Sequence, residues 1–255
     1  MLAIKLEEFV GRRVTAAGYI PIIGDWSMPL GMFLATWICV RLVDRRPWDF
    51  VLLGRSAARP SLLGASALIG AAAIGLPSLL LLSIGQLRAV EAPDGSWLFA
   101  ATATFANLLP SAAGEELFTR GYLFAVLRET IGWRWTLIVT SLVFGFMHTQ
   151  NPGADAESVV LVMLAGFFLG SIVLATRSLY AAIAVHFAWN WVMAAWLHTP
   201  VSGIAVIAPD YRVVDNGPDW LTGGAWGPEG GFAAAVSMFV IVIYIYTRHL
   251  RRMEQ

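Results

Sequence analysis

The chain has 255 residues, of which 58% are hydrophobic and only 13% are charged. Soluble domains carry about 25% charged residues, so this composition excludes an ordinary soluble domain and indicates an integral membrane protein. A membrane span needs about 20 mostly apolar residues, which predicts an all-α bundle of about seven or eight membrane helices in a single membrane domain over residues 1–255. The formal net charge is zero, and we expect contact with the lipid bilayer and none with nucleic acid.

The N-terminal segment and the single cysteine carry no predicted chemistry. Residues 1–24 place apolar side chains at spacings of three and four among charged ones, which predicts a helix on the membrane surface. Glu7 and Glu8 interrupt this segment before a signal-peptide core can form. Cys39 lies in an apolar run without a neighbouring base, so we interpret it as a packing residue; one cysteine also excludes an internal disulfide.

Apolar runs predict the membrane segments in chain order. The first span is predicted at 26–42 and the second at 61–86, where Gly75 and Pro77 should kink the helix without destroying it. Residues 97–110 are expected to cross back, and residues 115–128 to form a separate short helix. Further spans are predicted at residues 135–147, 158–176, 179–197 and 232–247, the last of these being the final span.

The placement of arginines predicts the topology. The loop after the first span is the most basic of the chain, so the positive-inside rule makes it cytoplasmic; its arginines are Arg41, Arg45, Arg46, Arg55 and Arg59. The tail after Arg248 is basic as well. Residues 198–231 form an acidic loop rich in proline and glycine, predicted to be external and not a packed domain. These assignments agree if the 115–128 helix dips into the membrane from the cytoplasmic side.

Charged residues interrupt the apolar sequence at 114–121, Gly-Glu-Glu-Leu-Phe-Thr-Arg-Gly. Ionisable groups at membrane depth are costly, so they usually pair, line a cavity and mark function. Glu116 and Arg120 are four residues apart and are predicted to form an ion pair on one helix face. Glu115 points about 100° away and stays free for chemistry. The alternative is the start of an interfacial helix, where the helix dipole favours acids.

Two of the four histidines lie within apolar segments. His148 ends the run Phe144–His148, and His186 is followed by Asn190 on the same helical face. Polar groups in lipid must converge to be satisfied, so we expect these side chains and the glutamates to share a cavity. No role is predicted for His198 or His249.

Together these residues form the pattern Glu-Glu-x-x-x-Arg at 115–120, Phe-x-x-x-His at 144–148 and His-x-x-x-Asn at 186–190. The pattern resembles the CAAX protease and bacteriocin-processing family of intramembrane enzymes, and the resemblance covers residues 97–197, the segment with the predicted catalytic core motifs. It implies the all-helical membrane bundle of the eukaryotic CAAX endoprotease. It also implies hydrolysis of a peptide bond in a peptide or membrane-protein substrate.

The residue types favour a water nucleophile, because no serine or cysteine sits beside a histidine in these motifs. Glu115 with His148 could activate the water, and His186 with Asn190 could stabilise the oxyanion, roles that the resemblance also implies. Glu116 and Arg120 are predicted to support the site. No cofactor and no metal are expected. The alternative is a zinc protease that uses Glu115, His148 and His186 as ligands, although the His-Glu-x-x-His helix is absent.

Two other classes of function compete with a glutamate-type protease. A non-catalytic peptide-binding or bacteriocin-immunity protein would keep the polar cavity for a ligand. A transporter would also place charges at mid-membrane, but would usually contain internal repeats, and none is evident. The short, lysine-poor chain indicates a multi-pass protein of the prokaryotic inner (plasma) membrane. The sequence does not identify the substrate.

Overall fold

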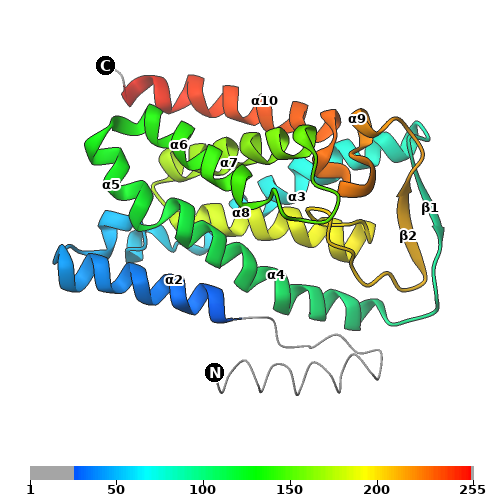
Figure 1. The fold of residues 1–255 in the computed structure, drawn as a ribbon, viewed down its shortest axis with the longest axis horizontal. Helices are drawn as coiled ribbons and strands as arrows, with labels where there is room; N and C mark the ends of the chain where they lie inside the picture. Colours follow the sequence, from blue (N-terminus) through cyan, green and yellow to red (C-terminus); the bar gives the residue numbers. More distant parts are fainter. Residues whose placement is uncertain (1–25, 254–255) are drawn as a thin grey trace.

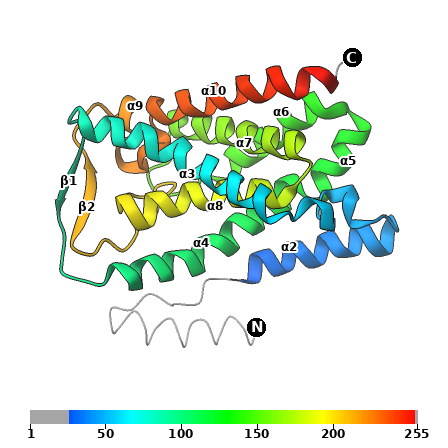
Figure 2. The same cartoon turned by 180° about the vertical axis from the view of Figure 1, so that it is seen from behind.

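The computed structural model describes residues 26–253, and most of them lie in helices packed together in one bundle (Figures 1 and 2). The predicted surface helix at 1–24 lies outside the described residues. The main helices are α2 (Ser27–Trp37), α3 (Pro60–Ser83), α4 (Trp97–Arg120), α5 (Tyr122–Thr130), α6 (Gly132–Met147), α7 (Ala156–Thr176), α8 (Leu179–Val192) and α10 (Phe232–Arg248).

Shorter elements extend or connect these helices. A π-helical segment, Ile38–Val43, continues α2, and another, Met193–Leu197, continues α8. Single 3-10 turns lie at Trp48–Val51, Arg55–Ala57, Gly224–Trp226, Pro228–Gly230 and Leu250–Met253. The four-residue helix α9 covers Asp219–Thr222.

Helix α8 lies at the centre of the packing. It contacts α3, α4 and α7, and Leu179, Ala181, Ala182 and Val185 on it are fully buried. Small side chains allow close approach: Gly70 of α3 packs so tightly that a Cβ atom there would lie 2.1 Å from the carbonyl oxygen of Val185. Such small-residue contacts are typical of helices that pack within membranes.

The outer surface of the bundle is apolar. Large exposed side chains include Leu68 and Phe146, each 72% exposed, and Leu76, Phe239 and Val240. Exposed large apolar side chains in this number mark contact with lipid or with another protein. Within residues 26–253, α3 and α7 are long and apolar enough to cross a membrane, while α10, and α2 with its extension, are apolar but shorter. These helices support membrane embedding without confirming the predicted number of spans.

The prediction of separate helices at 97–110 and 115–128 is wrong. One helix, α4, runs from Trp97 to Arg120 and includes Pro110, because neighbouring helices in a membrane compensate for the hydrogen bond that proline removes. The break falls at Gly121, where a Cβ atom would lie 2.2 Å from the carbonyl oxygen of Leu117. Both glutamates therefore lie in the last turns of a long helix, and α5 is a separate helix of nine residues.

The segment 198–231 is more ordered than predicted. Its strand β2 (Tyr211–Asp215) pairs antiparallel with β1 (Leu87–Glu91), with Leu87 opposite Asp215 and Glu91 opposite Tyr211. Thr222, Trp226 and Gly230 are buried. The helical prediction for the fold holds for the bundle, but it missed this two-stranded sheet, because the strands are far apart in the sequence and each is only five residues long.

Candidate active site

The two adjacent glutamates of α4 have different surroundings. The side chain of Glu116 is fully buried, whereas that of Glu115 is 17% exposed. Glu115 accepts a hydrogen bond through Oε1 from the hydroxyl of Ser111 at 3.1 Å, and its backbone carbonyl accepts one from Thr119 at 2.7 Å. Consecutive residues on a helix point about 100° apart, so one carboxylate faces the helix packing and the other faces His148 and His186.

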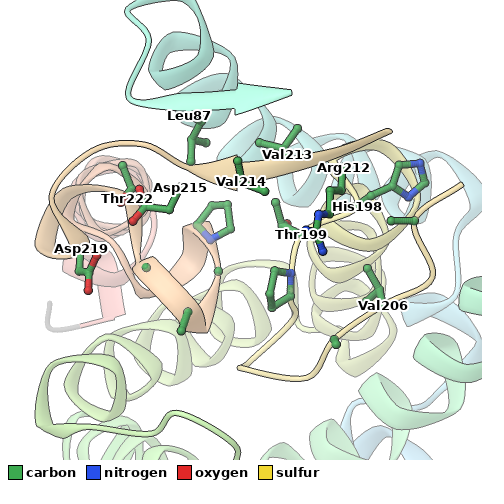
Figure 3. A pocket seen from close by; sticks show the side chains of 17 residues that line it. Leu87, His198, Thr199, Val206, Arg212, Val213, Val214, Asp215, Asp219 and Thr222 are labelled. Carbon is green, nitrogen blue, oxygen red and sulfur yellow. The ribbon is translucent and has the colours of Figure 1, made fainter. Parts of the chain in front are cut away.

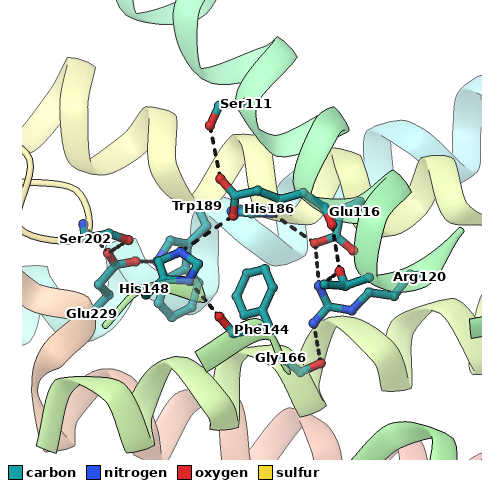
Figure 4. A network of polar contacts seen from close by, with 12 residues as sticks. Ser111, Glu116, Arg120, Phe144, His148, Gly166, His186, Trp189, Ser202 and Glu229 are labelled. Carbon is teal, nitrogen blue, oxygen red and sulfur yellow. Dashed lines mark hydrogen bonds and ion pairs between the residues drawn. The ribbon is translucent and has the colours of Figure 1, made fainter. Parts of the chain in front are cut away.

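Glu116 and Arg120 form the predicted ion pair, with Nη1 of Arg120 3.0 Å from Oε1 of Glu116 and both side chains fully buried. Arg120 also donates from Nη2 to the carbonyl of Gly166 at 2.8 Å, and its guanidinium lies 4.3 Å from the ring centroid of Phe144. The pair thereby joins α4 to α6 and α7 (Figure 4). A buried charge needs this kind of compensation.

His148 follows the last turn of α6, and its orientation is set by the backbone. Its Nδ1 lies 2.8 Å from the carbonyl oxygen of Phe144. Because a carbonyl oxygen only accepts, Nδ1 carries the proton, and in the neutral ring Nε2 is then an acceptor. Nε2 lies 3.6 Å from Oε2 of Glu115.

His186 of α8 contacts both glutamates. Its Nδ1 lies 3.1 Å from Oε1 of Glu116, and its Nε2 lies 3.9 Å from Oε2 of Glu115. The carboxylate of Glu116 therefore accepts from the ring and fixes its orientation, as in other carboxylate–histidine pairs. The sequence placed Glu116 with Arg120 alone; its contact with His186 joins residues 70 positions apart and has no local signal.

One carboxylate oxygen is at the centre of this arrangement. Oε2 of Glu115 faces Nε2 of both histidines and is buried without a hydrogen-bond partner. Both separations exceed hydrogen-bonding distance, and polar atoms at such separations are commonly bridged by water. The geometry therefore suits a water molecule held between a carboxylate and two imidazoles.

A small cavity adjoins this group. His148, His186 and Asn190 contribute its polar wall, and the apolar wall includes Val162, Ala165, Phe168, Leu169 and Met238. Its volume is about 30 Å³, which is enough for about two water molecules and too small for a peptide segment. The structure thus brings Glu115, His148, His186 and Asn190, predicted from three separate sequence motifs, to one place.

The sequence motifs did not include three further residues of this site. Trp189 on α8 also lines the cavity, and Ser202 and Glu229 reach it from the segment 198–231 (Figure 4). Glu229 sits in a stretch of prolines and glycines that gave no sign of a buried contact. Its proximity follows only from the folding of that segment over the bundle.

A larger cavity of about 370 Å³ lies beneath the β1–β2 sheet (Figure 3). Leu87, His198, Arg212 and Asp219 are among its lining residues, whereas Glu115, His148, His186 and Asn190 are not. We therefore place the chemistry at the smaller cavity. Among residues 26–253, no group of three or more His, Cys, Asp or Glu side chains is arranged to hold a metal ion.

Comparison with known proteins gives one match, to part of the chain. Residues 95–192 match the family model described as type II CAAX prenyl endopeptidase Rce1-like. The match confirms the family resemblance predicted from the sequence, over a segment that contains all of the motif residues. No curated protein and no solved structure matches the chain.

Proposed function

We propose that this protein is an intramembrane endopeptidase that hydrolyses a peptide bond with a water molecule activated by Glu115 and His148. The observation that carries the proposal is the buried, unpaired Oε2 of Glu115, which faces Nε2 of both His148 and His186. The match of residues 95–192 to a family of CAAX endopeptidases supports the reaction class.

Glu115 acts as the general base in this mechanism. It takes a proton from the water as the oxygen attacks the scissile carbonyl carbon, and it can return that proton to the leaving amine. His148 accepts a hydrogen bond from the same water through Nε2 and orients it. Ser111, which donates to the other oxygen of Glu115, keeps the carboxylate turned toward His148 and His186.

His186 and Asn190 are the proposed donors to the oxyanion of the tetrahedral intermediate. Because Nδ1 of His186 donates to Glu116, Nε2 donates to the oxyanion in the imidazolium form of the ring, which carries a proton on both nitrogens. They lie one helical turn apart on α8 and both line the cavity. Glu116 holds the His186 ring in place through Nδ1, and Arg120 balances the charge of Glu116. A donor of this kind contributes about 3 kcal/mol to stabilising the transition state.

We also propose that the bundle is a multi-pass protein of the prokaryotic inner membrane. In this proposal the predicted set of about seven or eight spans comprises α2 with its extension, α3, α4, α6, α7, α8 and α10. The substrate would then be a peptide or membrane protein that reaches the cavity at membrane depth.

Cleavage in defined membranes tests this function. Proteomes of membranes containing the wild type or Glu115→Gln are compared for new peptide termini, and a candidate peptide is then digested with both proteins in liposomes. We expect cleavage only with the wild type, and incorporation of ¹⁸O from labelled water into the new carboxyl group. The control variant is Glu157→Gln, an exposed glutamate in the first turn of α7.

Three results would contradict the proposal. Full activity of folded Glu115→Gln would exclude the general base. Stoichiometric zinc, whose removal abolishes cleavage and whose return restores it, would instead assign Glu115, His148 and His186 as ligands. Binding of the peptide with no cleavage by the wild type would favour the non-catalytic alternative.

A further inference from the structure

Glu229 is the carboxylate of the site that belongs to none of the sequence motifs. It lies in the 3-10 turn Pro228–Gly230, and its side chain lines the cavity with His148, His186 and Asn190. It has no ion-pair partner among residues 26–253. Its two oxygens instead accept hydrogen bonds from neutral groups of two different segments (Figure 4).

The first of these groups belongs to the helix that carries the proposed oxyanion donors. Nε1 of Trp189 donates to Oε2 of Glu229 at 2.9 Å. Trp189 is 5% exposed, it immediately precedes Asn190, and its ring packs against Phe168 with centroids 6.3 Å apart. A fixed indole ring at this position restricts the rotation of α8 about its axis, and that rotation sets the direction of the Asn190 side chain.

The second group belongs to a tight turn over the cavity. Oε1 of Glu229 accepts from the backbone nitrogen of Ser202 at 2.5 Å and from its hydroxyl at 2.8 Å. Ser202 and Gly203 both have positive φ, of 49° and 77°, a conformation that costs free energy for serine. The turn is closed by mutual backbone hydrogen bonds between Val201 and Ile204. The two hydrogen bonds to Glu229 therefore offset the free-energy cost of this backbone conformation and hold the turn in place.

That turn is also joined to the chain just after His148. Nδ2 of Asn151 donates to the carbonyl of Ser202 at 3.0 Å. A Cβ atom at Gly203 would lie 1.9 Å from the carbonyl oxygen of Pro152, so the two turns are in direct backbone contact. Through Ser202, Glu229 is thus connected to the segment that follows the proposed water-orienting histidine, and through Trp189 to the helix of the oxyanion donors.

We infer that Glu229 is a positioning residue, which fixes the separation between His148 and the His186–Asn190 face of α8. The inference rests on the proposed function. Glu229 acts through Trp189 and Ser202 and not on the substrate. A misplacement of about 1 Å between catalytic groups costs about 100-fold in rate, so a residue that joins both sides of the cavity governs kcat.

Kinetics of a near-isosteric variant tests the inference. In Glu229→Gln the amide oxygen can still accept from Ser202, but the NH₂ group cannot accept from Trp189. We expect kcat per folded enzyme to fall about 10-fold to 100-fold, with KM changed less than about 3-fold. Asp219→Asn makes the same chemical change at an exposed position of the same segment and should leave kcat unchanged.

A second variant distinguishes positioning from substrate contact. Trp189→Phe keeps an aromatic ring but removes the donor, so it should lower kcat in the same way. The double variant should be little worse than Glu229→Gln alone, because both changes break one contact. A rise in KM at constant kcat, multiplicative losses in the double variant, or unchanged kcat per folded enzyme would overturn the inference.

A distance measurement decides the inference without relying on cleavage. Spin labels are attached at Phe146 of α6 and Ile204 of the turn, which are 72% and 55% exposed, in a Cys39→Ser background. We expect one narrow distance distribution in the wild type and a broadened or shifted one in Glu229→Gln. An unchanged distribution would show that Glu229 does not hold the turn, whatever the outcome of the Glu115→Gln comparison.

Discussion

The adjacent residues Glu115 and Glu116 have different roles because consecutive side chains on a helix point in different directions. Glu116 is completely enclosed and its charge is balanced by Arg120, so it can orient His186 without taking part in proton transfer. Glu115 keeps one oxygen without a hydrogen-bond partner beside the two histidines. Two adjacent glutamates on one helical turn therefore supply a structural carboxylate, Glu116, and a candidate general base, Glu115. Substitutions of the two residues are tested by different measurements, stability for the first and cleavage rate for the second.

Because Glu115 and His148 are proposed to act on the same water molecule, we expect the losses of cleavage rate in their variants to be non-additive. Glu115→Gln and His148→Ala should each nearly abolish cleavage, and the double variant should be little worse than either single variant, because the two side chains hold the same water. Rates of peptide cleavage per folded enzyme measure this. Losses that multiply in the double variant would mean that the two residues act in separate steps.

The oxyanion donors should be less critical than the base. His186→Ala and Asn190→Ala should each lower kcat by about 100-fold to 1000-fold and leave measurable activity. Because His186 also lies 3.9 Å from Oε2 of Glu115, its loss should exceed that of Asn190. Single-turnover rates with a labelled peptide provide the measurement. Wild-type rates for Asn190→Ala would remove it from the proposed oxyanion site.

Arg120→Ala should act mainly on folding. The change leaves the fully buried Glu116 without its cation, at a cost of about 3–5 kcal/mol, and it removes the hydrogen bond to Gly166. Yield of folded protein and thermal unfolding in detergent report the effect. Glu129→Gln, which alters the exposed ion pair with Arg46, is the control and should change the free energy of unfolding by less than about 1 kcal/mol. Wild-type stability of Arg120→Ala would contradict the structural role.

At the level of helices and strands, apolar runs predicted most of the bundle, since α3, α6, α7, α8 and α10 begin and end close to the expected positions. The error at α4 arose because Pro110 and Gly114 resemble a helix end in sequence, whereas packing against α2 and α8 carries the helix through them. The β1–β2 pairing joins segments more than 100 residues apart, and Glu229 contacts residues more than 25 positions away. Local sequence patterns do not encode such contacts.

The start of α7 gives a pH-dependent prediction at this scale. Asp155 caps the helix by accepting from Ser158, whose hydroxyl reciprocates at the backbone of Asp155. The hydrogen bonds from Ser158 hold the pKa of Asp155 below its ordinary value of 3.8. The cap therefore stabilises the protein fully above pH values near that ordinary pKa, and the contribution is lost as the pH falls through the lowered pKa.

Asp155→Ala should thus destabilise the protein by about 1 kcal/mol at neutral pH. The difference from the wild type should shrink below the ordinary carboxyl pKa, where the wild-type cap is protonated as well. Unfolding in detergent across this pH range measures the effect, with the exposed Glu157→Gln as control. A difference that stays constant down to the lowest pH would show that the charge of Asp155 does not contribute to the cap.

Over the whole molecule, charge is separated between the two ends of the bundle. The segment between α2 and α3 and the end of α10 lie at one end, and the β1–β2 sheet with α9 lies at the other (Figures 1 and 2). The first end carries Arg46, Arg55 and Arg248, and an ion pair between Arg46 and Glu129 ties α5 to it. The other end includes Asp155, Asp210 and Asp219. This separation agrees with the predicted topology.

The topology predicts which face of the membrane the site opens on. Ser202 and Glu229 cover the cavity and belong to the segment 198–231, which we expect to be external, so substrate should approach from outside the cytoplasm. Single cysteines at Ser56, Ala225 and His249, all exposed, are introduced into a Cys39→Ser background in intact cells. A membrane-impermeant maleimide should label position 225 only, and positions 56 and 249 only after lysis. Labelling of positions 56 and 249 in intact cells, with position 225 protected, would show that the topology is the reverse of the predicted one. The entrance to the active site would then lie on the cytoplasmic face.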